Sequence, residues 1–499
     1  MSEKIQKLRE ILAEIFDLER ASALLGWDQQ TYMPSAGALM RGYQSGTIDR
    51  MAHDMATSAA LGKLLDDLRP TAGSLDPDSD DARLVRVAAL DFERAKCVPS
   101  DYVEELARVA AQAFPAWAQA RQSSRFSVFQ PYLEKLVEMT HRYVSFFPPA
   151  AHPYDVLLDR FEPGLTTAEV QAIFKPLREK QVALIKWIAT APQVDDSCLH
   201  QKFDTQAQWD FGVHIITKIG FDWNRGRQDK SAHPFTVGLS ADDVRITTRM
   251  NPDYFGDSLF STMHECGHAL YEQGFAEGLG RSPLGNAASL AVHESQSRMW
   301  ENLVGRSLSF WRYAYPALVT SFPQLKGVPL TTFYKAINRV QPSLIRTEAD
   351  EATYNLHVML RMEIEIALLE GTLAVKDLPE AWNSRMKDYL GVTPPDDAHG
   401  VLQDVHWAYG ELGYFPTYAL GNLISAQLWE TIRAQIPDIE AQIEAGKFDA
   451  LLGWLREKIH RHGRKFAPQE MVRRVTGSGI DAAPYLRYLE TKYRAIYEG

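Results

Sequence analysis

The chain has 499 residues, of which 45% are hydrophobic and 23% are charged, and these ordinary globular proportions exclude disordered and fibrous classes. Lys and Arg total 53 against 64 acidic residues, which gives a formal net charge of −11. Because an acidic surface repels phosphate backbones, nucleic acid is not expected as a partner. The length alone suggests two to four domains, at about 150 residues each.

Three cysteines, Cys97, Cys198 and Cys266, lie far apart and form no CxxC pair. A disulfide framework is therefore not expected, and a reducing compartment fits best. The N-terminal stretch is charged throughout and lacks the apolar core of a signal peptide. No apolar run approaches the ~20 residues that a membrane-spanning helix needs. We therefore predict a soluble, cytoplasmic protein with no membrane partner.

Helical periodicity dominates the chain. The first apolar stripe has spacings of three and four residues: Ile5, Leu8, Leu12, Ile15 and Leu18. It predicts an amphipathic helix that packs against the body of the protein and breaks by Gly26 and Pro34. Residues 70–81 predict a solvated loop, residues 148–153 a rigid connection, and Thr166 with Glu169 a capping box at a helix start. None of these breaks resembles an interdomain linker, so we predict one large, mostly α-helical domain over residues 1–499.

One segment departs from the helical pattern. Val244, Ile246 and Thr248 alternate with polar residues, which predicts a β-strand. Residues 233–237 are expected to pair with it as a hairpin, across a loop containing Gly238. Peptides are commonly bound as an added strand at an exposed sheet edge. A small sheet placed just before the next motif therefore suits peptide binding.

That motif is His264-Glu265-Cys266-Gly267-His268, an HExxH sequence on a predicted helix. Residues four apart lie on the same side of a helix, so both imidazoles can share a metal. Glu265 lies beside that face and can reach a water without binding the metal itself. The alternative is a pair of hydrogen-bonded core histidines. Buried imidazoles and a buried carboxylate need a partner, and a metal supplies one.

A third ligand decides the kind of metal site. The metzincin pattern requires glycine and histidine where Tyr271 and Gly274 stand. A second predicted helix, after a glycine-rich turn, carries Glu294, which we rank first as the third ligand. His293 and Glu301 are the alternatives, and Glu301 is otherwise interpreted as orienting a ligand or forming an ion pair. Two histidines, one glutamate and an open fourth position are typical of catalytic zinc.

Beyond this motif, the chain resembles the M32 metallocarboxypeptidases, the family that includes carboxypeptidase Taq. The resemblance covers nearly the whole chain, with its motifs in the family's order. The similar segments are His233-Pro234-Phe235, the DxRxT string at 243–247, HECGH at 264–268, HESQ at 293–296, the IRxxAD string at 345–350 and GxxQDxHW at 400–407.

The resemblance implies a mainly α fold, with a deep active-site groove, a small β-sheet at its wall and a gluzincin-type HExxH metal site. It implies the release of single C-terminal residues, with broad specificity, from peptides that have a free C-terminus. It also implies a homodimer, and zinc or, in some members, cobalt as the cofactor. His264, His268 and Glu294 would hold the metal, and Glu265 would act as the general base.

An exopeptidase must recognise a free carboxylate, for which arginine is the natural bidentate partner. The family string assigns this role to Arg346, with Asp350 as the group that orients it, and Arg245 is the second candidate. By family position, Gln403 and His406 resemble substrate-binding or transition-state groups. The alternatives are an ordinary ion pair for Arg346 and a structural hydrogen bond for His406.

Three further side chains are candidates. Tyr418 could donate to the developing oxyanion, although a buried structural tyrosine is the alternative. His233 and Asp243 could orient ligands or shape the groove. Two other functions compete with the carboxypeptidase: a helical HExxH zinc oligopeptidase or endopeptidase, and a non-catalytic helical binding scaffold. The intact metal-binding set argues against the scaffold, and the products of peptide digestion distinguish the two peptidases.

Overall fold

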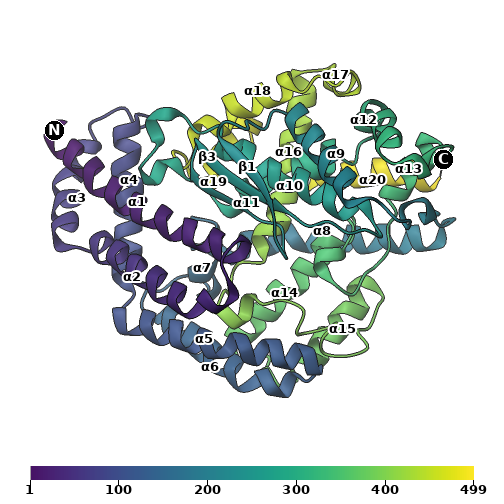
Figure 1. Cartoon of the computed structure of the whole chain (residues 1–499). Helices are drawn as coiled ribbons and strands as arrows, with labels where there is room; N and C mark the ends of the chain where they lie inside the picture. The colour runs from purple at the N-terminus through teal and green to yellow at the C-terminus, as the bar shows by residue number, and fades with distance from the viewer. Residues whose placement is uncertain (1, 499) are drawn as a thin grey trace. The chain divides into compact units, whose positions relative to one another are not determined.

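Helices make up most of the protein, and the computed structural model describes residues 2–498 (Figure 1). The predicted mainly α fold with one small sheet is confirmed. The chain divides into two compact units, each built from three separate stretches. Unit 1 contains Met1–Lys96, Asp196–Ile337 and Leu428–Gly477, and unit 2 contains Cys97–Asp195, Asn338–Gln427 and Ser478–Gly499. The single domain expected over residues 1–499 stays a prediction.

Unit 1 holds the sheet and the HExxH sequence. Its helices are α1 (Ser2–Thr31), α2 (Ala38–Ala56), α3 (Ala59–Ala72), α4 (Asp80–Cys97), α9 (Thr205–Lys218), α10 (Phe255–Glu272), α11 (Leu290–Arg298), α12 (Leu308–Ser321), α13 (Leu330–Ile337), α17 (Ile439–Glu444), α18 (Asp449–Lys458) and α19 (Pro468–Thr476). A further helix, α16 (Pro416–Gln435), begins in unit 2 and ends in unit 1. Among the described residues, no helix is both long and apolar enough to cross a membrane.

The predicted apolar stripe of the first helix forms a core with two neighbouring helices. Leu8 and Leu12 are buried in one cluster with Leu65 of α3 and Leu84 of α4. Helix α1 and helix α2 run side by side as a hairpin in both views (Figure 1). Of the two residues expected to break this helix, Gly26 does not, because α1 runs through it; the helix ends at Thr31, before Pro34. One glycine in an otherwise favourable helix costs only about 1 kcal/mol, which packing against the sheet can offset.

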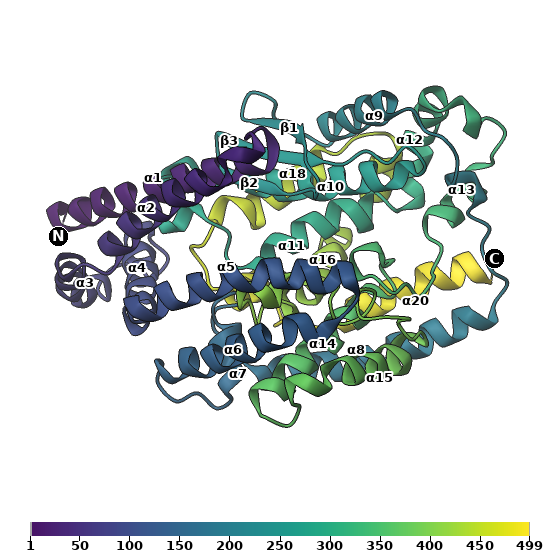
Figure 2. The same ribbon diagram turned by 60° about the horizontal axis from the view of Figure 1, so that its bottom comes forward.

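The sheet has three strands: β1 (Gly226–Lys230), β2 (Thr236–Ser240) and β3 (Asp243–Thr248). The order is β1-β3-β2, with β1 parallel and β2 antiparallel to the central β3. Val244 and Ile246 are fully buried, as the alternation predicted, and β3 packs on α10 (Figure 2). The position of β2 was predicted wrongly, because Gly238 lies inside this strand, opposite Val244, and not in the turn.

Helix α10 begins seven residues after β3 ends, and its position follows from its burial. Leu259, Phe260, Met263 and Leu270 are buried on it, as the sequence pattern indicated. The helix packs against β3, α9 and α11. The two histidines of the HExxH sequence are therefore carried by a helix that is held on several sides, which gives a metal site a rigid support.

Unit 2 is helical throughout. Its helices are α5 (Ser100–Ser123), α6 (Phe126–Ser145), α7 (Pro153–Leu158), α8 (Thr167–Thr190), α14 (Tyr354–Leu369), α15 (Leu378–Leu390) and α20 (Ala483–Tyr497). The predicted capping box of Thr166 and Glu169 starts α8. Helix α14 contacts α6, α7, α8 and α15. Its polar residues His357, Arg361 and Glu365 are completely buried and lie four residues apart, so they share one face.

Candidate active site

Two helices of unit 1 approach so closely that their backbones touch. A Cβ atom on Gly267 of α10 would lie 2.6 Å from the carbonyl oxygen of Gln296 and 2.6 Å from Cα of Ser297, both on α11. No side chain fits in this space, so glycine is required here. The glycine within the HExxH sequence thus lets α11 pack directly beside the two histidines.

The contact of these helices brings together the three predicted metal ligands. Nε2 of His264 lies 3.2 Å from Nε2 of His268. Oε2 of Glu294 lies 3.5 Å from the first nitrogen and 3.4 Å from the second. One ligand atom from each residue falls within 4.8 Å of the others. This convergence is the arrangement that the spacing of the motif predicted.

The outer ring nitrogens show how the two imidazoles are oriented. Nδ1 of His264 lies 2.8 Å from Oε2 of Glu301, and Nδ1 of His268 lies 3.1 Å from the backbone carbonyl of His293. A carboxylate and a carbonyl only accept hydrogen bonds, so each Nδ1 carries the hydrogen. In the neutral imidazoles, both Nε2 lone pairs then point at the carboxylate of Glu294. Three acceptors that face one another fit a divalent cation, which binds all three.

Arg298 and Ser297 donate hydrogen bonds to the carboxylates of Glu294 and Glu301, which hold these carboxylates in place. Nε of Arg298 donates to Oε1 of Glu294 over 2.7 Å, and Nη1 donates to Oε2 of Glu301 over 3.0 Å. The hydroxyl of Ser297 donates to Oε2 of Glu294 over 2.9 Å. Burial raises the pKa of Glu294, but Arg298 and His264 outweigh it and hold this pKa well below its ordinary value. Glu301, on the π-helical segment Met299–Val304 that follows α11, has its pKa lowered to about 2 against the effect of burial, mainly by Arg298. Both carboxylates are therefore ionised at neutral pH.

The two imidazoles differ in their affinity for a proton. Burial, reinforced by His293, lowers the pKa of His268 to about 3. Burial also acts to lower the pKa of His264, but Glu294 and Glu301 outweigh it and leave that pKa above its ordinary value. A metal binds only the neutral imidazole. His264 is therefore the ligand at which a proton competes with a cation.

Glu265 is held by a contact with the sheet. Its Oε2 atom lies 2.6 Å from the hydroxyl of Thr236 on β2, and the residue is 7% exposed. Burial raises the pKa of this carboxyl group, and the hydrogen bond from Thr236 opposes part of that rise. A buried carboxylate with a raised pKa, next to a candidate metal site, is suited to general base catalysis.

In unit 2, Arg346 belongs to a buried cluster of charges. Its Nε atom lies 3.0 Å from Oδ1 of Asp404, and its Nη1 atom lies 2.8 Å from the hydroxyl of Tyr354. Nε of Arg361 lies 2.6 Å from the other carboxylate oxygen of Asp404. Asp404, and not Asp350, is thus the group that orients Arg346, because Asp350 instead accepts hydrogen bonds from the backbone nitrogens of neighbouring residues.

Three other predicted residues lie around this arginine. Oε1 of Gln403 accepts from the backbone nitrogen of Arg346 over 2.9 Å and from Nη2 of Arg361 over 2.7 Å. The guanidinium carbon of Arg346 lies 4.8 Å from the centre of the Tyr418 ring. The hydroxyl of Tyr418 lies 3.3 Å from Nε2 of His406. Four residues predicted separately therefore form one cluster in unit 2.

The remaining predicted residues lie in or next to the sheet of unit 1. Arg245 is held by both carboxylate oxygens of Asp243, at 2.9 and 2.8 Å, and stacks on the ring of Trp27 at 4.5 Å. His233 lies in the exposed loop before β2, and its backbone carbonyl accepts from the hydroxyl of Ser231. The structure therefore brings Asp243 and Arg245 together on β3.

Sequence analysis missed Thr236 and Asp404 as parts of the site. Asp404 lies inside a motif string, between Gln403 and His406, and that position was the available signal. Thr236 lies within the run expected to form a strand, but nothing in the pattern indicated which side chain would contact Glu265. Both residues act through contacts with distant segments, which spacing along the chain does not reveal.

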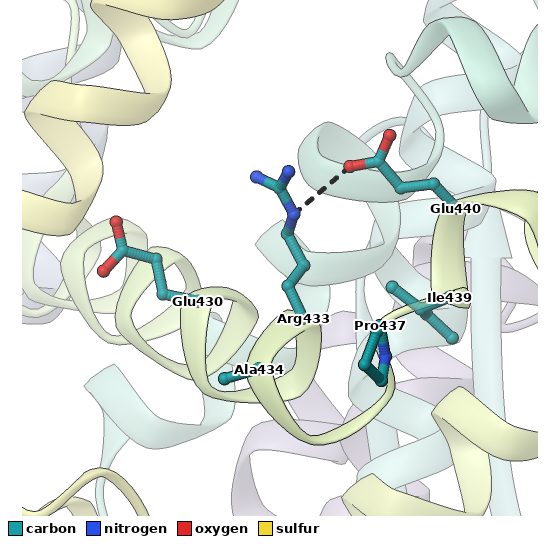
Figure 3. A pocket seen from close by; sticks show the side chains of 6 residues that line it. All are labelled: Glu430, Arg433, Ala434, Pro437, Ile439 and Glu440. Carbon is teal, nitrogen blue, oxygen red and sulfur yellow. Dashed lines mark ion pairs between the residues drawn. The ribbon is translucent and has the colours of Figure 1, made fainter.

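A surface pocket of about 590 Å³ lies elsewhere in unit 1, at the end of α16 (Figure 3). Arg433 and Glu440 face each other across it at 3.3 Å. The other lining residues are Glu430, Ala434, Pro437 and Ile439. None of the predicted site residues lines this pocket, so we do not consider it a candidate active site.

A mostly helical fold in which two histidines of an HExxH helix meet a glutamate of the next helix defines a helical metallopeptidase. Comparison with known proteins narrows this class. Residues 7–493 match the model of the carboxypeptidase Taq (M32) metallopeptidase family. The chain therefore belongs to the M32 family, and it is a metallocarboxypeptidase, a peptide hydrolase that uses a divalent metal.

Relatives and solved structures agree with this assignment. The chain is 41% identical to thermostable carboxypeptidase 1 of Thermus thermophilus, over 99% of this chain and 98% of that protein. It is 38% identical to carboxypeptidase 1 of Bacillus subtilis, over 98% of this chain and 97% of that protein. The crystal structure of an M32 carboxypeptidase from Deinococcus radiodurans matches with a TM-score of 0.97 and 42% identity, over 100% of both chains.

Proposed function

We propose that this enzyme is a zinc carboxypeptidase that releases single C-terminal residues, with broad specificity, and that Glu265 is its general base. The observation that carries the proposal is the convergence of His264 Nε2, His268 Nε2 and Glu294 Oε2 within 4.8 Å. Two imidazoles and one carboxylate form a donor set typical of catalytic zinc, which retains an open position. Cobalt, which accepts similar ligands, is the second candidate.

When bound, such a cation supplies Lewis acidity towards the scissile carbonyl and towards water. The protein supplies the proton transfers. Glu265 takes a proton from the attacking water and delivers it to the leaving amine, for which a carboxyl group with a raised pKa is suited. Thr236 holds the carboxylate in one orientation through its hydroxyl. The Nδ1 hydrogens of His264 and His268 are bonded to Glu301 and to the carbonyl of His293, which leaves the two Nε2 atoms as the ones that would hold the metal.

The charge balance in unit 2 supports Arg346 as the residue that binds the C-terminal carboxylate of the substrate. Arg346 and Arg361 are both buried and share the single carboxylate of Asp404, so this cluster carries one positive charge in excess. Burial, together with the neighbouring Arg346, lowers the pKa of Arg361 to about 10 against the effect of Asp404. An anion placed against Arg346 would balance the excess charge.

The other residues of this cluster receive narrower roles. The amide of Gln403 is used within the protein, since its Nε2 atom donates to the carbonyls of Leu344 and Gly400 while Oε1 accepts from Arg346. We therefore propose that Gln403 places Arg346 and does not bind the peptide directly. Tyr418 and His406 form a hydrogen-bonded pair that could donate to the oxyanion of the transition state.

The sheet supports binding of the peptide as an added strand. Strand β2 is an edge strand, and its residue Thr236 contacts the proposed base. A peptide paired with this edge would lie beside Glu265. On the same strand, the carbonyl of Gly238 already accepts from Nη1 of Arg20 over 3.1 Å. His233 and Asp243 would shape the ends of this edge, while the homodimer and the cytoplasmic location remain predictions.

The proposal is tested by digesting one unblocked peptide with the full-length enzyme, with and without a chelator, and weighing the products by mass spectrometry. A ladder of single C-terminal losses that disappears with the chelator is the expected result. Internal cuts would indicate the endopeptidase alternative. The absence of cleavage, with zinc bound, would indicate the binding scaffold.

A further inference from the structure

Glu272 and the ring of His293 lie beside the metal ligands but have no part in the proposed mechanism. We propose that Glu272 and His293 are a positioning pair, which fixes His268 and Glu294 in the geometry that the metal requires. The proposal rests on the assignment of those two residues as ligands in the proposed function. It assigns to Glu272, which lies outside the motifs discussed above, a defined role in metal binding.

The first observation is that two residues of α10 contact His293, which lies on α11. Glu272 lies one helical turn after His268 on α10, so both side chains project from the same face. Oε1 of Glu272 lies 2.9 Å from Nε2 of His293, while the backbone carbonyl of His293 accepts from Nδ1 of His268 over 3.1 Å. The rings of His268 and His293 are stacked, with centres 4.2 Å apart and planes within 13°.

These contacts act on two ligands at once. The carbonyl of His293 fixes the tautomer and the rotation of the His268 ring, and the stacked ring restricts it further. Glu294 is the next residue along α11, so any shift of His293 moves this ligand as well. A pair that holds His293 therefore controls the distance between the imidazole of His268 and the carboxylate of Glu294.

The second observation concerns the space left for Glu272. Gly238 on β2 lies against the carboxylate, and a Cβ atom at this position would overlap Oε2 of Glu272. The obstructing atom is the end of a flexible side chain, so alanine at position 238 would displace the carboxylate and leave the strand in place. The glycine thus makes room for the carboxylate of Glu272, whose other oxygen contacts His293.

The pair of Glu272 and His293 is also largely shielded from water, which strengthens the interaction between the two side chains. The side chains of His293 and Glu272 are 18% and 19% exposed. Ion pairs or hydrogen bonds that are largely shielded from water lose less to screening than fully exposed ones do. Partners that orient a metal-binding histidine typically change metal affinity by about 10- to 100-fold when they are removed.

The test is the dissociation constant of zinc, measured on full-length apo-protein by competition with a coloured chelator. We expect Glu272→Gln and Gly238→Ala each to weaken zinc binding at least tenfold and to change the visible spectrum of the cobalt-loaded protein. His268→Ala is the reference for losing a ligand. Glu277→Gln is the matched control, because it removes the same charge from an exposed position five residues away and should leave zinc affinity unchanged.

A double-mutant cycle separates positioning from general damage. In a Glu272→Ala background, the carboxylate is gone, so Gly238→Ala should have no further effect on zinc affinity. Thermal unfolding of each apo-protein shows whether the variants fold. An additive loss in the double variant would mean that Gly238 acts by another route, and it would overturn the proposed link.

Two further outcomes would overturn the proposal in distinguishable ways. If His268→Ala weakens zinc binding but Glu272→Gln does not, the ligand assignment stands and the positioning pair is wrong. If neither variant weakens binding, the ligand assignment of the proposed function fails as well. Unchanged zinc affinity with a raised KM for Glu272→Gln would show that the pair contacts the peptide instead.

Discussion

The hydroxyl of Thr236 lies within hydrogen-bonding distance of both the carboxylate and the backbone carbonyl of Glu265, at 2.6 and 3.0 Å. One edge strand of the small sheet is therefore fixed to the HExxH helix at the residue proposed to transfer protons. In the proposed function, the sheet would have two tasks: its edge would bind the peptide, and Thr236 would lower the pKa of the base beside that edge.

The first prediction concerns this hydrogen bond. Burial raises the pKa of Glu265, and the bond from Thr236 lowers it, so Thr236→Val should raise the pKa further. A base acts in its ionised form, so the acidic limb of the profile of kcat/KM against pH should move to higher pH. Thr217→Val on α9 serves as the control, and an unmoved acidic limb in Thr236→Val would contradict the assignment.

The second prediction concerns Glu265 itself. Glu265→Gln keeps the shape of the side chain but cannot accept a proton, so kcat should fall by about 10²- to 10⁴-fold. The variant should bind as much metal as the wild type, because Glu265 is not one of the three converging ligands. Metal content by atomic absorption and initial rates on one peptide check both statements. Full activity with metal bound would rule out Glu265 as the base.

The third prediction concerns recognition of the C-terminus. Arg346→Ala should lower kcat/KM for a free peptide at least about tenfold, since a hydrogen bond to a charged group contributes about 1.5–3 kcal/mol. The change leaves Asp404 paired with Arg361, so this buried carboxylate keeps a partner of opposite charge. Arg245→Ala is the comparison, because that guanidinium is held by Asp243. An amidated peptide should be a poor substrate of the wild type, and equal cleavage of both peptides would contradict the proposal.

The fourth prediction concerns metal removal. A chelator should abolish activity, and zinc or cobalt should restore it, since two imidazoles and a carboxylate suit these ions better than magnesium. The metal-free protein should also unfold at a lower temperature, because a ligand that binds only the folded state stabilises it. Activity that survives complete metal removal, verified by elemental analysis, would contradict the metallopeptidase mechanism.

The fifth prediction concerns the pH dependence of stability. Burial raises the pKa of Glu365 from 4.5 to about 7, although Tyr154, Gly413 and Trp407 donate hydrogen bonds to it. The folded state therefore keeps a proton that the unfolded state releases, and the free energy of unfolding should fall as pH rises from about 4.5 to about 7.

Glu365→Gln should remove this part of the pH dependence. Urea unfolding of wild type and variant, at several pH values across that window, measures the difference. Glu370→Gln, at the exposed C-cap position just after the same helix, should leave the slope as it is in the wild type. A parallel pH dependence in wild type and Glu365→Gln would show that this carboxyl group titrates normally.

The parts of the fold that could be predicted are those that depend on local periodicity. Helical spacing identified the helix that carries His264 and His268, and the period of two in β3 identified a strand. Strand β1 could not be predicted, because Gly226–Lys230 is polar and becomes a strand only by pairing with β3. The register of β2 was also missed, because it is set by contacts with β3 and α10 and not by its own sequence.

In the candidate site, too, the features set by local spacing could be predicted and those set by tertiary contacts could not. The trio of His264, His268 and Glu294 could be predicted, since two ligands share a helical turn and the third follows after a short connection. The ion pair of Arg346 with Asp404 could not, because the two residues lie 58 positions apart in the chain and the nearer Asp350 offered a simpler partner. The choice between two acidic partners is made by tertiary packing, which periodicity does not encode.

The interleaving of the two units bears on how the protein is made. The three ligands all lie in the middle stretch of unit 1, whereas its last stretch, Leu428–Gly477, follows most of unit 2 in the chain. During synthesis, unit 1 therefore cannot finish folding until residue 477 has left the ribosome. Its HExxH helix ends at Glu272, so about 205 further residues must emerge first, at about 5–20 residues per second. We expect a nascent chain of this design to depend on chaperones, and expect fragments that stop before Leu428 to be degraded rather than to survive as smaller enzymes.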